Sequence, residues 1–127
     1  MRRLAACVAV AALVLGSVAP AMAATETVTG KIVDQSCYMK DKVNNAGVDH
    51  KMPADTKECA IACAKKGRPL ALLTTDGKVY TIAGALAADS NAKLVGHVAH
   101  TVSITGDVTT KDGAMTIAAA DLKMVSR

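Results

Sequence analysis

The near absence of aromatic side chains most limits what this chain can fold into. Its 127 residues contain no Trp and no Phe, and its aromatic residues are Tyr38 and Tyr80. A hydrophobic core must therefore come from Val, Ile, Leu, Met and Ala, in a sequence that is 51% hydrophobic. A single small domain can bury such a core, but with little surplus stability. A covalent or metal cross-link would help to hold it together.

The first 23 residues read as an export signal. Arg2 and Arg3 precede an apolar run over residues 4–18, and residues 21–23 form an A-x-A pattern. This order is typical of a cleavable secretory signal peptide, and the apolar run is too short to anchor the chain in a bilayer. We therefore expect one domain, residues 24–127, in the periplasm or outside the cell, without stable membrane insertion. Cys7 would be removed with the signal.

The charge of the mature chain argues against nucleic acid as a partner. Without Arg2 and Arg3 it has 13 basic and 11 acidic side chains, a net charge of +2. A phosphate backbone requires a strongly basic surface, and stacking of single-stranded bases requires aromatic side chains that are scarce here. The partners we expect are a metal ion and another exported protein.

Hydrophobic alternation predicts a mainly β domain. Asp76-Gly77 and Asp112-Gly113 are typical of tight hairpin turns, each between two apolar segments. The last strand changes its apolar phase, which indicates a bulge at residues 119–121. The expected strands are residues 27–33, 70–74, 78–83, 101–108 and 114–125.

Two short helices are expected between these strands. Asp55 and Glu58 form a capping box before an Ala-rich run, and Gly67 would end that helix. A second helix over residues 91–98 has a narrow apolar stripe. This order of elements predicts a five-stranded OB-like barrel with two short helices. The alternative is an open antiparallel α+β sheet with both helices on one face.

Two segments of the chain, residues 27–32 and 103–108, are similar to each other. Both have a β-branched alternating pattern that is interrupted by a glycine, Gly30 in the first and Gly106 in the second. A glycine inside a strand often marks a bend or a close approach of another backbone. We therefore expect glycine bends at matching points of the first and fourth strands.

The mature chain carries three cysteines, Cys37, Cys59 and Cys63. An odd number of cysteines cannot pair completely within one chain. Cys59 and Cys63 stand at i and i+4 of the predicted helix, where Cβ atoms lie about 5–6 Å apart, whereas a disulfide requires about 3.5–4.5 Å. This pair is therefore better placed to chelate a metal ion than to bond to itself.

A tetrahedral metal site requires two more ligands, and the nearest in sequence are Cys37 and His50. Together with the helical pair they form a Cys3His set for a soft metal ion. Met39 and Met52 each follow one of these ligands by two residues and are candidates for additional ligands. Their thioethers favour Cu(I) over Zn(II), so that copper is the first expectation and zinc the second.

A disulfide is the competing interpretation. Pairing of Cys37 with Cys59 or Cys63 would close a loop of roughly 22 to 26 residues and stabilise the fold by about 3 to 4 kcal/mol. The protein would then be a disulfide-stapled interaction or ligand-binding module without metal. The chain has no G-x-S-x-G, phosphate loop or H-E-x-x-H motif, and we do not expect an enzyme.

Five further residues receive weaker assignments. His97 and His100, three residues apart, are candidates for additional metal ligands, although histidines at a helix end are more often solvated. Met115 and Met124 are expected in the core rather than at copper. Asp34, at the end of the first strand, is expected to be a solvated acid.

The cysteine segment resembles a group of small exported bacterial OB-like proteins of uncharacterised function. Their pattern is C-Y, then H, then C-A-x-x-C-x-x-x-G-x-P and D-G-K-x-Y, and the chain matches it from Cys37-Tyr38 to Tyr80. The resemblance implies that Cys37, His50, Cys59 and Cys63 occur as a set. It implies an OB-like fold but no particular activity.

Overall fold

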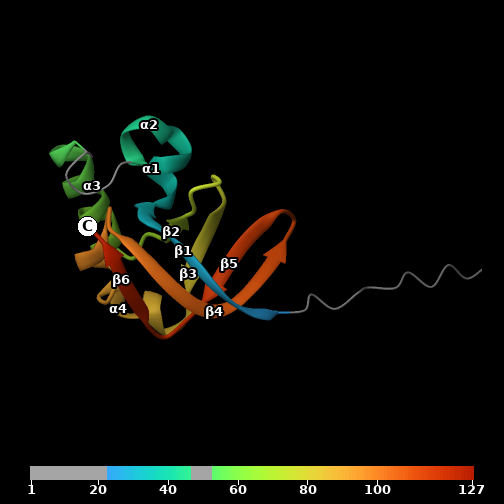
Figure 1. The fold of residues 1–127 in the computed structure, drawn as a ribbon. Coiled ribbons are helices and arrows are strands. Elements are labelled where there is room, and N and C mark those ends of the chain that lie inside the picture. Colours follow the sequence, from blue (N-terminus) through green and yellow to red (C-terminus); the bar gives the residue numbers. More distant parts are fainter. Residues whose placement is uncertain (1–22, 47–52) are drawn as a thin grey trace, which may run out of the picture.

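The computed structural model describes residues 23–46 and 53–127, so the expected signal peptide lies outside the described residues apart from Ala23. Figure 1 shows α1 and α2 above the strands, α3 at their upper left and α4 at their lower left. In the described part of the chain, no helix has the length and hydropathy needed to cross a membrane. The elements, with η marking a 3-10 helix, are β1 (Ala24–Asp34), α1 (Gln35–Lys40), α2 (Lys42–Asn45), α3 (Ala54–Lys65), β2 (Leu70–Leu73), β3 (Val79–Ala83), η1 (Gly84–Ala87), α4 (Ala88–Asn91), η2 (Val95–His97), β4 (Thr101–Lys111), β5 (Ala114–Ala118) and β6 (Leu122–Ser126).

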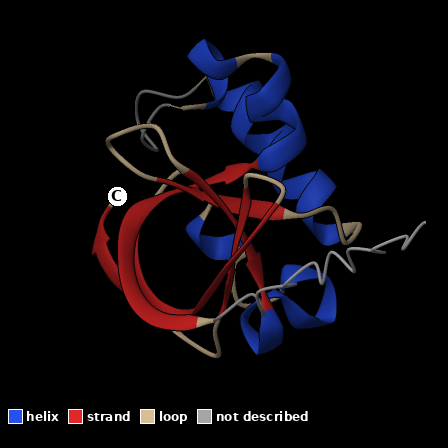
Figure 2. Cartoon of the chain, turned by 90° about the vertical axis from the view of Figure 1, so that its right-hand side faces the viewer, coloured by secondary structure: helices blue, strands red, loops and turns tan. Residues whose placement is uncertain are grey.

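Five strands close into a barrel, which Figure 2 shows as a ring of curved strands. The strand order is β1-β2-β3-β5-β4, and β4 pairs back with β1. The β3–β5 pair is parallel, while the other pairs are antiparallel. The predicted OB-like barrel is therefore confirmed, and the open sheet is excluded. The sixth strand, β6, adds to the edge of β4.

The predicted last strand is two strands. β5 pairs with residues 107–111 of β4, and β6 pairs with residues 101–104 on the same side. Between them the expected bulge at residues 119–121 is a full break, and there Ala119 exchanges backbone hydrogen bonds with Ala83 and Leu86. Met115 packs against the core as expected, but Met124 is 36% exposed, because it lies beyond the break.

Apart from Tyr80, the main core is aliphatic, as the sequence requires. The largest fully buried apolar side chains are Ile32, Leu70, Leu72, Leu86, Leu94, Ile104, Ile117, Val33, Val98 and Val102. A second, smaller cluster of Val33, Tyr38, Ala71 and Leu73 packs α1 onto the barrel. The segment after β1 is therefore held in place by burial of its single aromatic ring.

α3 begins two residues earlier than the capping box predicts. Pro53 is the N-cap residue, and no side chain caps the helix, so the assignment of Asp55 as N-cap is wrong. Asp55 instead lies in the first turn, where its charge interacts favourably with the helix dipole. The predicted stop is confirmed, because Gly67 has φ +80° and its N–H donates to Ala64 O at 2.9 Å.

The helix expected over residues 91–98 does not form. Asp89, Ser90 and Asn91 have φ values of 53°, 54° and 61°, so α4 is a left-handed turn. Asn91 is held there by its side chain, which donates from Nδ2 to Ala64 O at 2.9 Å and to Arg68 O at 3.0 Å. These bonds to the end of α3 override the local helical pattern, although Leu94 is buried as predicted.

Candidate functional site

The candidate site begins at the end of β1, where Asp34 caps α1. Asp34 Oδ1 accepts a hydrogen bond from the backbone N–H of Cys37 at 2.7 Å. Cys37 therefore lies in the first turn of a helix, and α1 and α2 fill most of the chain between β1 and residue 46, where the sequence analysis predicted neither helix nor strand. The helices are only six and four residues long, so that propensity alone could not indicate them.

Asp34 is the residue that the sequence interpretation missed. Its side chain is 2% exposed, so the expectation of a solvated acid is wrong. Oδ2 is buried and has no hydrogen-bond partner within the described part of the chain. An acid directly before a helix fits the N-cap pattern, so that a predicted helix over residues 35–40 would have identified its role.

Two of the three thiols line one pocket. Cys37 of α1 and Cys59 of α3 face a hollow of about 240 Å³, together with Asn45, Asp55 and Thr56. Cys59 is exposed, whereas Cys37 is half-buried. Cys63 follows one turn later on α3 and is also half-buried. All three carry free thiols in the structure.

The pKa of the Cys37 thiol depends on both of the other cysteines. Burial raises the pKa of Cys37 to about 11, with further increases from the hydrogen bond and charge of Asp34 and from the charges of Cys59 and Cys63. Cys37 is therefore protonated near neutral pH. Asp34 and any thiolate of Cys59 or Cys63 repel a Cys37 thiolate, so that a bound cation would be needed before several thiolates could coexist.

Among residues 23–46 and 53–127, no group of three or more His, Cys, Asp and Glu side chains is close enough together to hold a metal ion. His50 and Met52 lie outside the described residues. The structure thus brings Cys37 and Cys59 to one pocket and leaves the complete Cys3His set a prediction.

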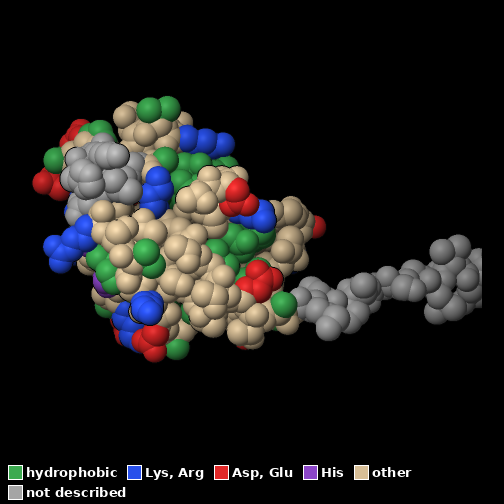
Figure 3. Space-filling model, viewed as in Figure 1, with side chains coloured by type: hydrophobic (Ala, Val, Ile, Leu, Met, Phe, Trp, Pro, Cys, Tyr) green, Lys and Arg blue, Asp and Glu red, His purple; other side chains and the backbone are tan. Residues whose placement is uncertain are grey.

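Met39 lies at a different surface from Cys37. Its side chain is 62% exposed and lines a separate groove of about 500 Å³, together with Tyr38, Lys42, Val79 and Met115. In Figure 3, hydrophobic side chains gather below α1 and α2, beside lysine and aspartate side chains. The groove, and not the thiol pocket, is therefore where this thioether is available.

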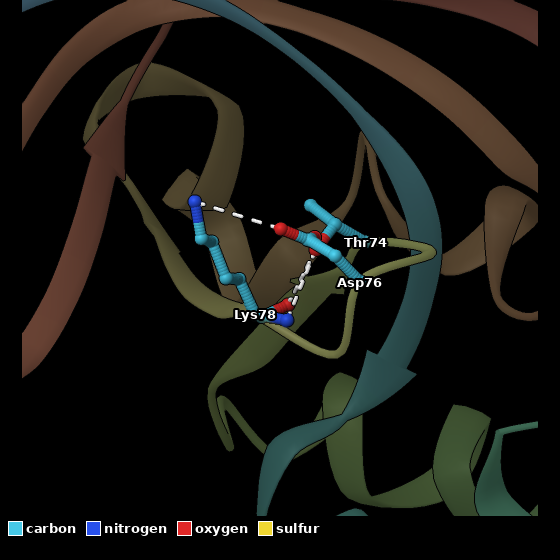
Figure 4. Close-up of polar contacts among 3 residues, drawn as sticks. All are labelled: Thr74, Asp76 and Lys78. Carbon is cyan, nitrogen blue, oxygen red and sulfur yellow. Dashed lines mark hydrogen bonds and ion pairs between the residues drawn. The ribbon is translucent and has the colours of Figure 1, made fainter.

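A tight turn forms one edge of this groove (Figure 4). Thr74 Oγ1 donates to the Asp76 carboxylate and accepts from the backbone N–H of Lys78 at 3.0 Å. The hydrogen bond from Thr74 lowers the pKa of Asp76, and Lys78 Nζ lies 3.5 Å from its Oδ2. The predicted hairpin at Asp76-Gly77 is confirmed, with Gly77 at φ +84°.

His97 ends η2, and His100 immediately precedes β4. Their ring centroids are 5.8 Å apart. Neither of them lines the thiol pocket. The structure therefore pairs these two candidate ligands with each other and not with the cysteines.

Comparison with known proteins found no relative of this chain. The chain matched no family model, no curated protein and no solved structure. The class defined by the structure is an OB-like barrel with a thiol-lined pocket above one end.

We predict that Cys37 reacts slowly with iodoacetamide at pH 8. A pKa near 11 instead of the ordinary 9.0 lowers the thiolate fraction about 100-fold. Greater nucleophilicity of the more basic thiolate restores about tenfold of this loss. Modification should therefore be about tenfold slower than for an exposed thiol of ordinary pKa, and mass spectrometry of peptides over time should show Cys59 modified first. Equal rates would contradict the burial and charge that we assign to Cys37.

We also predict that acid destabilises the fold through His97. Burial, and then the charge of His100, lowers the pKa of His97 below 6.5. The unfolded chain takes up this proton near pH 6.5, whereas the folded chain does so only at lower pH, so the free energy of unfolding falls as the pH drops through 6.5. Urea denaturation at pH 7.5 and 5.5 should show a smaller difference in His97→Gln than in the unmodified chain. An unchanged difference would rule out His97 as a source of this dependence.

Proposed function

We propose that the protein binds a soft transition metal ion between α1 and α3, with Cys37, Cys59, Cys63 and His50 as ligands. The observation that supports this proposal is the gathering of thiols from two separate helices. Cys37 and Cys59 line one pocket, and the charge of Cys63 also acts on the Cys37 thiol. His50 belongs to the segment that links α2 to α3, the elements on either side of that pocket.

The chemistry of these side chains sets the class of metal. Thiolates prefer Cu(I) and Zn(II), and a set of three thiols with one imidazole suits a tetrahedral site. Copper is our first choice, for which sequestration or delivery would be the task, and zinc is the second, for which it would stabilise the fold. Binding must displace the proton of Cys37, so that metal uptake should strengthen as the pH rises. In this proposal the protein is not an enzyme.

The second candidate is a disulfide-stapled module that binds a ligand or another exported protein. The same shared pocket favours it, because oxidation of Cys37 with a thiol of α3 would link the two helices covalently. The groove beside Tyr38 and Met39 would then be the binding surface. The two candidates differ in the number of thiols that titrate after chelation and denaturation: three for the metal site and one for the stapled module.

The deciding experiment is metal analysis of the full chain after export and purification without chelator. We expect about one equivalent of copper or zinc, with loss in Cys37→Ser and in Cys59→Ser. Thr56→Val is the matched control, because Thr56 lines the same pocket but is not a proposed ligand. Absence of metal together with a single titratable thiol would overturn the metal proposal and favour the stapled module.

A further inference from the structure

We propose that His97 and His100 form a second metal site, which takes a divalent transition metal ion through two imidazoles. It is separate from the thiol pocket, whose described lining contains neither histidine. The site is built on the turn between η2 and β4, and η2 packs against α3.

The backbone of this turn is fixed by β1. Ala99 N–H donates to Ile32 O at 2.8 Å, and Ile32 N–H donates to His100 O at 3.1 Å. His100 N–H also donates to His97 O at 2.9 Å, which closes the turn itself. The backbone positions of both histidines are therefore fixed by hydrogen bonds to β1, a strand of the barrel.

The backbone strain of the turn is concentrated at Ala99, which is fully buried and has φ +68°. A left-handed alanine is sterically strained, and such residues persist only where the surroundings impose them. Here the strain orients the residues on either side, since Ala99 lies between Val98 in the core and His100. Strain of this kind is frequent at binding sites.

The two rings are spaced as two ligands of one ion would be. Their centroids are 5.8 Å apart and their planes are inclined by 76°. A metal–nitrogen bond of about 2.0–2.1 Å, extended by roughly 1.2 Å to the ring centre, puts each centroid about 3.2 Å from a shared ion. Two such rings lie about 5.2 Å apart at a tetrahedral angle and about 6.4 Å apart in a linear arrangement. The observed separation falls between these limits.

A second observation that indicates a bound ligand comes from the His97 ring. Its Nδ1 is buried and has no hydrogen-bond partner within the described part of the chain, and a buried polar atom in that state requires an explanation. The lowered pKa of His97 keeps the ring neutral, which is the form that binds metal. His97 is half-buried, so its ring is partly open to solvent, whereas His100 is only 8% exposed.

The donor set indicates the ligand class. Two imidazoles suit Cu, Zn and Ni, and Cu²⁺ binds most strongly among the divalent ions of this series. Water or a small ligand would fill the other coordination positions, because no third His, Cys, Asp or Glu side chain joins the pair among the described residues. We therefore expect an exchangeable ion here, bound more weakly than one held by three thiols.

The test uses the full chain with Cys37→Ser, Cys59→Ser and Cys63→Ser combined, and Cu²⁺ as the probe. Without thiols, the outcome does not depend on the proposed thiol site. Equilibrium dialysis should show one bound equivalent, and nitrogen hyperfine structure in the electron paramagnetic resonance spectrum should report two imidazoles. His97→Ala should weaken binding at least tenfold, and His100→Ala should do the same.

Gly96→Ala is the matched control, since it changes η2 directly beside His97, adds a Cβ that meets no atom within 4 Å and should leave the affinity unchanged. His97 is half-buried, so its replacement keeps the test valid if loss of the buried His100 impairs folding, which circular dichroism would detect. Equal weakening by Gly96→Ala, a spectrum without two nitrogen ligands, or absence of binding in the thiol-free chain would each overturn the proposal.

Discussion

Gly106→Ala should destabilise the barrel by about 3 kcal/mol, at the upper end of overpacking effects. A Cβ at residue 106 would clash with the backbone carbonyl oxygen of Ala118 and would meet the carbonyl carbon of Ala118 and Cβ of Ala119 at 2.9 Å. These are mostly backbone atoms, which cannot rotate away as a side chain would. Relief would require β4 and β5 to separate, and β5 also carries the parallel pairing with β3.

Urea denaturation followed by far-ultraviolet circular dichroism measures this loss. Gly96→Ala is the matched control, because a Cβ there meets no atom within 4 Å, and its effect should be about 0.5 kcal/mol or less. Since an aliphatic barrel of this size has little stability to spare, Gly106→Ala should also lower the yield of folded protein. Equal midpoints for the two variants would show that β4 and β5 do not meet as closely as described.

Asn91→Ala should cost about 2 to 3 kcal/mol. The change removes two hydrogen bonds from the Nδ2 atom, to Ala64 O and Arg68 O. Asn91 is 4% exposed, so these carbonyl oxygens would lose a partner in a largely buried environment. Asn also tolerates the left-handed backbone that residue 91 adopts, with φ 61°, better than Ala does.

The same change should reach the candidate site. Ala64 directly follows Cys63, so the last turn of α3 would lose its link to α4, and Cys63 should react faster with a thiol reagent. Asn44→Ala is the control, because Asn44 is exposed and bonds locally to Asp41, and we expect about 0.5 kcal/mol or less. Loss of stability without faster modification of Cys63 would mean that α3 is held chiefly by its buried Ala60 and Ala64.

The sequence predicted the barrel well because its strands are strongly patterned. Val102 and Ile104 alternate into the core, and Asp76-Gly77 turns one hairpin, so that local chemistry and the fold agree. The glycines of the two similar segments also mark real contacts. A Cβ at residue 30 would lie 2.5 Å from Leu73 O, where β1 leaves β4 and joins β2.

The candidate site was predicted only in part. The spacing of Cys59 and Cys63 indicated a helical pair, and both lie on α3. The sequence did not indicate that Asp34 is buried beneath Cys37, that Met39 lines another groove, or that His97 packs against His100. Each of these depends on how α1 and η2 pack on the barrel, and contacts between distant segments leave no local pattern.

By itself the sequence determined the mainly aliphatic core, the strands with their hairpin turns, and the end of α3 at Gly67. These features depend on periodicity and turn chemistry, which act over a few neighbouring residues. The tertiary structure alone decided that residues 89–91 turn left-handed and that Cys37 shares a pocket with Cys59. The first outcome follows from hydrogen bonds between α4 and α3, and the second from burial of Tyr38, which seats α1 on the barrel. At both places contacts between segments distant in sequence decided the structure, and both places adjoin α3, which carries Cys59 and Cys63.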